Sequence, residues 1–264
     1  MVKLEREILM GKIAFHHGGR LKSLINKDES RKCWMCGNLA TTAEHKIKCS
    51  DLKLAFPNIS LAVGDRMIKT NSVGDESLVQ GWQSKEVKYK KNLCKQCNGS
   101  ISKAWDNAYL DFVLFLSKNP KLVYKNRAVD LKVIYGKNVK ESQVHLFRYF
   151  AKAFGCAIYE TGCEVPLVIL DIIYGKSYGK SFFVTVSSIE EIYDYNPATE
   201  GLLGCSDLMS IDNGNTPVAW RWLQNLAWFV IDFRFNLVVP EGAIPWTGKS
   251  KKILFSPSIK INTT

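Results

Sequence analysis

Most of what the sequence indicates about fold and chemistry is carried by three short segments: Cys33-Trp34-Met35-Cys36, Ala43-Glu44-His45 and Cys94-Lys95-Gln96-Cys97-Asn98. The two Cys-x-x-Cys pairs offer four thiolates, which is the number that a tetrahedral structural zinc ion takes. Fifty-seven residues separate Cys36 from Cys94, so the pairs would hold one ion at the two ends of a long insertion. We therefore predict a structural zinc site formed by Cys33, Cys36, Cys94 and Cys97.

Beside the cysteines stand three residues that a zinc site does not need, Glu44, His45 and Asn98. Phosphodiester hydrolysis requires a base that activates water and a divalent cation that neutralises the phosphate. A neutral histidine suits the first task, and carboxylate and amide oxygens suit Mg²⁺ or Mn²⁺. Taken singly, the three residues are typical of a structural histidine, a surface carboxylate and a helix N-cap. Their joint placement beside both cysteine pairs favours catalysis.

This order of Cys-x-x-Cys, acid-His and Cys-x-x-Cys-Asn resembles the HNH endonucleases, also called ββα-metal or His-Me finger nucleases, in their zinc-containing form. The resemblance covers residues 33–116. It implies a zinc-stabilised ββα core in which His45 is the general base and Glu44 and Asn98 bind the catalytic Mg²⁺ or Mn²⁺.

The same resemblance makes Asp106 a further candidate for that metal or for a place beside its ligands, because one bacterial branch has an aspartate in this helix. Two departures from the family pattern stand out. Glu44 replaces the commoner aspartate, and Lys48-Cys49 stands where many members have a turn containing proline.

Positive charge is concentrated in the half of the chain that carries these segments. The net charge is +11; residues 1–130 hold 23 Lys and Arg against 13 Asp and Glu, and residues 131–264 hold 13 against 12. Basic side chains that contact a phosphate backbone release its counterions, so DNA is the expected partner, with RNA and a merely solvated basic surface as alternatives. The candidate phosphate contacts are Lys85, Lys88, Lys90, Lys91, Lys95 and Lys103.

Composition is that of a globular protein, with 46% hydrophobic and 23% charged residues in 264. The longest apolar stretch, residues 223–239, is interrupted by Asp232, Arg234 and Asn236, so no membrane span is expected. The first residues lack the apolar core of a secretory signal. Paired cysteines indicate metal ligands in a reducing compartment, and we expect a cytoplasmic protein.

The pattern of apolar residues predicts an α+β fold in three parts. A basic N-terminal extension (1–32) precedes the nuclease domain (33–118), and an α+β domain (128–264) would serve target recognition, partner binding or dimerisation. The predicted elements are a helix from Cys97 to Pro120, strands at 128–135, 167–173 and 181–186, and helices at 141–154 and 189–193.

These features together favour a divalent-metal-dependent HNH endonuclease acting on DNA, in restriction or defence. The alternative is a non-catalytic, zinc-stabilised protein that binds nucleic acid or serves as a scaffold. The two differ in whether Glu44, His45 and Asn98 converge on a space for an ion.

Overall fold

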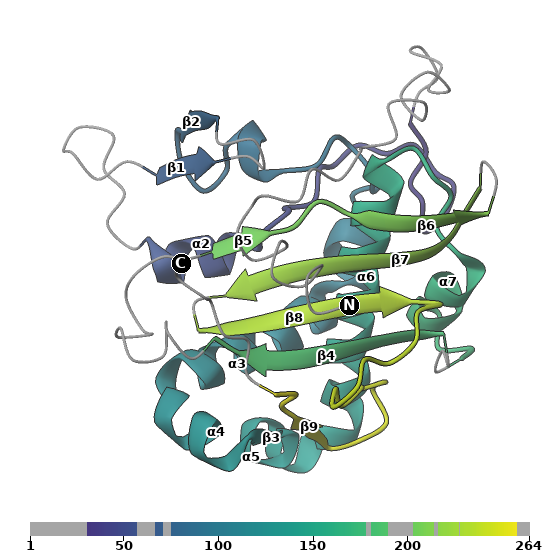
Figure 1. Ribbon diagram of the computed structural model, residues 1–264. Coiled ribbons are helices and arrows are strands. Elements are labelled where there is room, and N and C mark those ends of the chain that lie inside the picture. The colour runs from purple at the N-terminus through teal and green to yellow at the C-terminus, as the bar shows by residue number, and fades with distance from the viewer. Residues whose placement is uncertain are drawn as a thin grey trace.

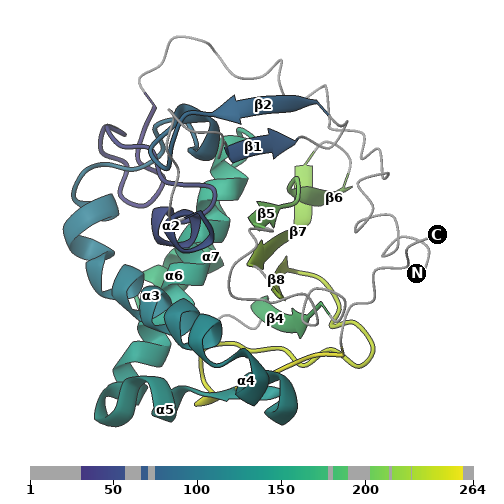
Figure 2. The same ribbon diagram turned by 90° about the vertical axis from the view of Figure 1, so that its left-hand side faces the viewer.

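One long helix, α6 (Val139–Glu160), lies between a second helix, α3 (Lys103–Lys118), and an antiparallel sheet in the computed structural model of the chain (Figures 1 and 2). The structure describes residues 31–56, 67–70, 75–177, 181–189, 203–213, 216–226 and 228–257. Helices and strands occur together throughout this part of the chain, which confirms the predicted α+β class. Apart from its last two residues, the predicted basic extension lies outside the described residues.

The helical elements are α2 (Cys49–Ala55), η2 (Lys85–Val87), the π-helical turn η3 (Cys97–Ile101), α3, α4 (Pro120–Asn126), α5 (Leu131–Tyr135), η4 (Gly136–Asn138), α6 and α7 (Leu167–Ile173). The strands are β1 (Met67–Thr70), β2 (Glu76–Val79), β3 (Ala128–Asp130), β4 (Phe182–Ser188), β5 (Leu203–Cys205), β6 (Met209–Asn213), β7 (Thr216–Leu226), β8 (Phe229–Phe235) and β9 (Lys252–Leu254).

The main sheet has the strand order β4-β8-β7-β5, with β6 also paired to β7, and all its described pairings are antiparallel. Alternate residues of β7, such as Trp220, Trp222 and Leu226, are buried, as expected for a strand with one face on the core. β1 pairs with β2, and β3 pairs with β9, as separate two-stranded units.

Helix α6 is buried on two sides because both α3 and the sheet pack against it. Phe150 packs edge-on against Phe112 of α3 and also against Phe233 of β8, with ring centroids 6.2 and 5.7 Å apart. Phe154 stacks on Phe182 of β4. One hydrophobic core therefore runs from the first cysteine pair through both helices into the sheet, and it is not divided between residues 118 and 128.

Two extended segments, residues 41–46 and 87–93, form an antiparallel ribbon that leads into the second cysteine pair. Thr42 pairs with Leu93 and His45 with Lys88. Backbone bonds such as Tyr89 N–H to the Glu44 carbonyl, 2.9 Å, hold the segments together. α2, β1, β2 and η2 lie between the two segments in the chain, and η3 and α3 follow the second segment.

One predicted strand is wrong, and another is confirmed only over its first three residues. Residues 128–135 form the short strand β3 followed by helix α5, whose N-cap is Asp130 with its side chain bonded to the Lys132 N–H. Residues 167–173 form helix α7, which begins after Pro166. A short apolar run does not distinguish a strand from a helix, and of the two helices only α5 has a capping side chain, that of Asp130.

Other predicted elements are confirmed. The helix after Cys97 ends at Lys118, the helix at 141–154 is the centre of α6, and the strand at 181–186 is β4. The apolar stretch 223–239 contains parts of β7 and β8. The helix predicted at 189–193 falls, beyond Ile189, outside the described residues. Among the described helices, none has both the length and the hydropathy needed to span a bilayer.

Gly155 of α6 provides a test of how closely the first cysteine pair is packed on this helix. A Cβ at this position would lie 2.5 Å from Cη2 of the Trp34 ring. Although alanine is the better helix former, we expect Gly155→Ala to destabilise the protein by about 1–3 kcal/mol, the usual range for overpacking. Urea unfolding measures this loss. In a Trp34→Ala background the same change should be neutral or stabilising, and an equal loss in both backgrounds would show that the ring is not responsible.

Candidate metal centre and active site

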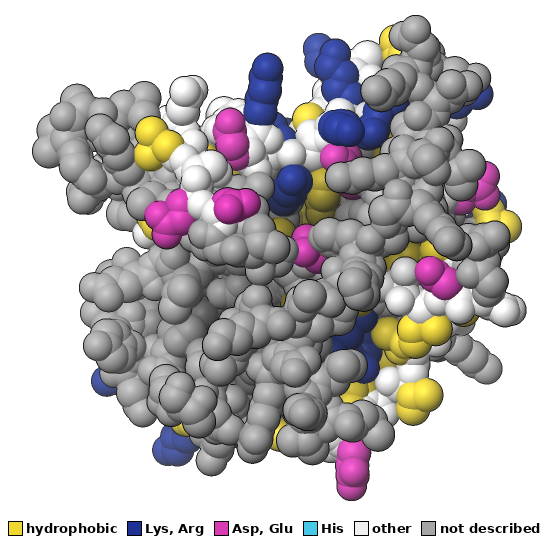
Figure 3. Space-filling view, turned by 45° about the horizontal axis from the view of Figure 1, so that its top comes forward, with side chains coloured by type: hydrophobic (Ala, Val, Ile, Leu, Met, Phe, Trp, Pro, Cys, Tyr) yellow, Lys and Arg dark blue, Asp and Glu magenta, His cyan; other side chains and the backbone are white. Residues whose placement is uncertain are grey.

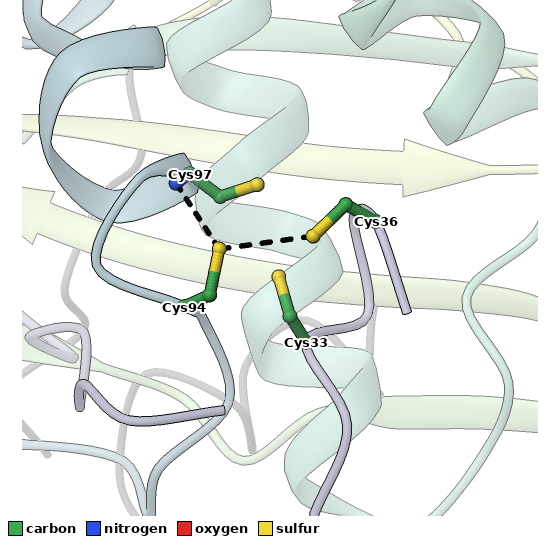
Figure 4. A group of neighbouring side chains, drawn as sticks. All are labelled: Cys33, Cys36, Cys94 and Cys97. Atoms are coloured by element: carbon green, nitrogen blue, oxygen red, sulfur yellow. Dashed lines mark hydrogen bonds between the residues drawn. The ribbon is translucent and has the colours of Figure 1, made fainter. Parts of the chain in front are cut away.

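The four cysteines of the two Cys-x-x-Cys pairs come together at one point, as predicted (Figure 4). Their sulfur atoms all lie within 4.8 Å of one another, and Cys36 Sγ is 3.7 Å from Cys94 Sγ. A tetrahedral zinc ion with Zn–S bonds of about 2.3 Å separates its sulfur ligands by about 3.8 Å. Both the donor chemistry and the spacing therefore fit zinc, and four thiolates leave no open coordination position.

The backbone of each pair is folded for this purpose. In the first pair, the Gly37 N–H donates to the Cys33 carbonyl, 2.8 Å, and Gly37 has a φ of 76°, which favours glycine. In the second pair, the Cys97 N–H points at Cys94 Sγ, 3.4 Å. That N–H lowers the pKa of the Cys94 thiol to about 7, which favours the thiolate form that binds metal.

Helix α6 and the segment after α7 hold the first cysteine pair in place. The Trp34 indole N–H donates to Cys156 Sγ, 3.4 Å, and the Tyr174 hydroxyl donates to the Met35 carbonyl. The Tyr159 hydroxyl bonds to the Lys32 carbonyl, 2.7 Å. The zinc centre is therefore packed against the C-terminal half of the chain.

His45 lies on the first segment of the ribbon, half-buried, with a defined ring orientation. Its Nε2 is 3.0 Å from the carbonyl oxygen of Trp82. Because a carbonyl only accepts hydrogen bonds, Nε2 carries the proton and Nδ1 of the neutral ring presents its lone pair. Burial lowers the pKa of His45, against the opposing effects of the Trp82 carbonyl and Glu44, so the neutral form dominates at pH 7. The ring has the tautomer and charge of a general base.

Glu44 points toward α6 instead, where it meets a buried lysine. Its carboxylate is 2.8 Å from Nζ of Lys152, and the same ammonium lies 3.2 Å from the Asp106 carboxylate. Lys48 forms a further ion pair with Asp106. We call these four residues, Glu44, Asp106, Lys48 and Lys152, the carboxylate–lysine cluster. Two carboxylates and two ammonium groups balance each other within it.

The opposite charges of the cluster stabilise one another in their ionised forms. Burial by itself would lower the pKa of Lys152, but the Glu44 and Asp106 carboxylates outweigh it and raise the pKa well above the ordinary value. Burial likewise opposes ionisation of Asp106, and Lys152 and Lys48 together bring its pKa below the ordinary value. Both groups are therefore charged at neutral pH.

Asn98 is the second residue of η3 and is half-exposed. Its backbone N–H donates to the Cys94 carbonyl, 3.0 Å, and within the described part of the chain no hydrogen bond joins its side chain to Glu44 or His45. The structure thus brings Glu44 and Asp106 together through Lys152, places His45 on the other side of the ribbon, and leaves Asn98 apart from both.

The lysines predicted to contact phosphate lie mostly on the surface, as Lys85, Lys90, Lys91, Lys95 and Lys103 are exposed. Lys88 is half-exposed and bonds Gln83 through Nζ, 2.7 Å. Figure 3 shows Lys and Arg side chains gathered at the upper edge of one face, with a few Asp and Glu side chains among them. This surface therefore carries many basic side chains together with a few acidic ones.

Another buried carboxylate, Asp51, lies in the first turn of α2, only 3% exposed. The Tyr109 hydroxyl donates to it at 2.6 Å, and the Tyr109 ring stacks on Tyr149. Burial raises the pKa of Asp51 to about 6.

Several residues of this region have no motif in the sequence: Lys48, Asp51, Trp82, Ser102 and Lys152. One signal was present for Lys152, which is flanked by alanines and phenylalanines in Phe150-Ala151-Lys152-Ala153-Phe154. A lysine inside so apolar a helical segment indicates a buried, paired charge. Trp82 acts through its backbone carbonyl, for which a sequence carries no signal.

Comparison of the chain with protein-family models, with curated proteins and with solved structures finds no match.

The zinc site predicts a specific loss on substitution of one ligand. Cys36→Ser should remove about one equivalent of zinc per chain and lower the melting temperature by about 10 °C, or about 3–4 kcal/mol in a chain of this size. Zinc analysis of the purified protein and thermal unfolding measure both effects. Cys205→Ser, at an exposed cysteine of β5, is the matched control. Full zinc content in Cys36→Ser would contradict the assignment.

Asp51 makes stability depend on pH with a defined sign. A carboxyl whose pKa rises from 3.8 unfolded to about 6 folded costs stability as pH increases through that interval, and the full cost is present above pH 6. Asp51→Asn removes the charge but keeps an acceptor for Tyr109, so it should be more stable than wild type by about 1–3 kcal/mol at pH 8, and by less at pH 5. Urea unfolding at both pH values tests this, with Asp111→Asn on the exposed face of α3 as control. A constant difference would rule out ionisation as its origin.

Proposed function

We propose that this chain is an HNH endonuclease that hydrolyses phosphodiester bonds in DNA, with His45 as the general base. The observation that carries the proposal is the anchored ring of His45, in which Nε2–H is held by the Trp82 carbonyl and Nδ1 has no hydrogen-bond partner among the described residues. A histidine held in one tautomer by a backbone carbonyl is the arrangement that general-base catalysis needs.

Support also comes from the surroundings of His45. The ribbon that carries it passes through Leu93 directly into Cys94, so the zinc centre and α3 hold its second segment. Two antiparallel segments followed by a helix are the order that a ββα core requires. In this proposal the zinc ion holds the ribbon and takes no part in the reaction.

His45 acts at the phosphate in the following way. A water molecule beside Nδ1 transfers a proton to the ring as its oxygen attacks phosphorus. The P–O bond to the leaving group breaks, and the leaving oxygen takes up a proton from solvent water. Exposed lysines beside the ribbon, such as Lys90 and Lys91, provide contacts to the phosphates on either side.

The proposal includes a catalytic Mg²⁺ or Mn²⁺ ion only because the sequence resembles the HNH endonucleases. Glu44 and Asn98 have the oxygen donors that such ions prefer. In the structure, however, the carboxylates of Glu44 and Asp106 are bound to Lys152. Among the described residues, no hydrogen bond joins the Asn98 side chain to either carboxylate. The residues in this arrangement do not fit a divalent ion.

That arrangement favours a second candidate, a non-catalytic zinc-stabilised protein that binds nucleic acid or serves as a scaffold. In it the carboxylate–lysine cluster is a purely structural group of charges. Both candidates keep the zinc site and the basic surface, and only the first predicts cleavage. A role in restriction or defence is part of the first candidate function, the endonuclease.

Cleavage by a His45 variant decides between the two. Zinc-loaded protein with Mg²⁺ or Mn²⁺ should nick or cut plasmid DNA, and His45→Ala should lower the rate by about 10²–10⁴-fold because the base is lost. Gel assays with plasmid, single-stranded DNA and RNA measure this and identify the substrate.

The matched control is His145→Ala. His145 is a half-buried histidine of α6 that pairs with Glu141 instead of lying on the ribbon, so its loss should leave cleavage unchanged. Zinc content and melting temperature show whether both variants are folded. Undiminished cleavage by His45→Ala would refute the base assignment, and salt-sensitive DNA binding without cleavage in every condition would favour the second candidate.

A further inference from the structure

Lys152 is an unusual residue for its location. It lies in the middle of α6 and is 1% exposed, between the phenylalanines that pack on α3 and the sheet. Moving an ammonium group out of water carries a large desolvation penalty unless opposite charges and hydrogen bonds compensate. The contacts of its Nζ atom are therefore informative.

Those contacts use the full hydrogen-bonding capacity of the group. Nζ lies 2.8 Å from Glu44 Oε2, 3.2 Å from Asp106 Oδ1 and 3.3 Å from Ser102 Oγ. An ammonium has three N–H donors, and these three acceptors match them. The acceptors come from the ribbon and from the start of α3, where Ser102 is the N-cap residue, so Lys152 connects α6 to two other parts of the chain.

Each carboxylate oxygen around Lys152 also has a hydrogen-bond or ion-pair partner. Glu44 Oε1 accepts the His45 N–H at 3.0 Å, and Oε2 binds Lys152. Asp106 Oδ1 binds both Lys48 and Lys152, and Oδ2 accepts the Ser102 hydroxyl at 3.2 Å. A divalent cation needs such oxygens as ligands, so it has to displace an ammonium group to reach them.

We infer that Lys152 takes the cation position between Glu44 and Asp106, and that a divalent ion binds these carboxylates strongly only when the Lys152 ammonium is removed. A helix of the C-terminal half thus determines the metal affinity of the ribbon. The inference deepens the proposed function, on which it rests for the relevance of Glu44 to catalysis. Its test is metal binding, which is independent of cleavage.

Lys152→Met provides the test, because methionine has a similar length and no charge. In zinc-loaded protein without other metals, the variant leaves Glu44 without its ammonium partner and should melt at a lower temperature than wild type. Millimolar Mn²⁺ should restore part of that loss, while wild type should change little. Titration of free Mn²⁺ by EPR should show binding about tenfold tighter than in wild type, or more, because a like charge has been removed from the site.

Two matched variants locate the effect. Lys48→Met removes an ammonium from Asp106 but leaves Lys152 in place, so its gain in Mn²⁺ affinity should be much smaller. Glu44→Gln combined with Lys152→Met should lose the gain, because the carboxylate is absent. The inference is overturned if Lys152→Met binds Mn²⁺ no more tightly than wild type, or if the double variant keeps the gain.

If Lys152→Met does not fold, wild-type protein decides the matter. Stoichiometric Mn²⁺ should leave the NMR signals of the Glu44 and His45 amides sharp, because Lys152 excludes the ion, and paramagnetic broadening of those signals overturns the inference. Neither result depends on nuclease activity. If the protein cuts DNA through His45 but Lys152→Met gains no affinity for Mn²⁺, the proposed function stands and this inference fails. If Lys152→Met gains affinity for Mn²⁺ but the protein does not cut DNA through His45, the inference stands and the proposed function fails.

Discussion

A charge buried in the centre of a protein must be neutralised where it lies, and Lys152 imposes that requirement on this fold. Its ammonium group projects from the central helix α6 and is satisfied by Glu44 from the ribbon and by Asp106 and Ser102 at the start of α3. Breaking one of these partnerships would leave an uncompensated buried charge, which is far more costly than losing an exposed ion pair. The ribbon, α3 and α6 are consequently held in one relative position.

The zinc centre and the cluster around Lys152 hold the ribbon in complementary ways. The four cysteines join the beginning of its first segment to the end of its second, and residues of the C-terminal half contact the first pair. The cluster holds the middle of the first segment through Glu44. The sheet adds a third contact, because Gln224 of β7 donates to the Lys46 carbonyl at 3.0 Å. His45 lies between these attachments, and its ring contacts the Trp82 carbonyl, which determines its tautomer.

Structural features that depend on local sequence patterns were predicted correctly. The apolar spacing of α3 and its end at Asn119-Pro120 follow from helix geometry and from the missing N–H of proline. The alternation in β7 follows from one buried face of a sheet, whereas β4 and β8 are buried at nearly every position. The strand expected at 167–173 was wrong, and the one expected at 128–135 holds only for 128–130, because so short an apolar run carries too little periodicity to distinguish a strand from a helix.

By itself, the sequence determined the four-cysteine site that can hold a metal ion, since the spacing of two Cys-x-x-Cys pairs already provides the thiolates and the turns that present them. It also placed an acid and a histidine beside those pairs. Only the tertiary structure decided what each does: the Trp82 carbonyl orients His45, and Lys152, more than a hundred residues from Glu44, neutralises its carboxylate. A backbone carbonyl is the same in every residue, and a buried ion pair is chosen by the packing of helices far apart in the chain. Neither leaves a pattern of spacing that a sequence could show.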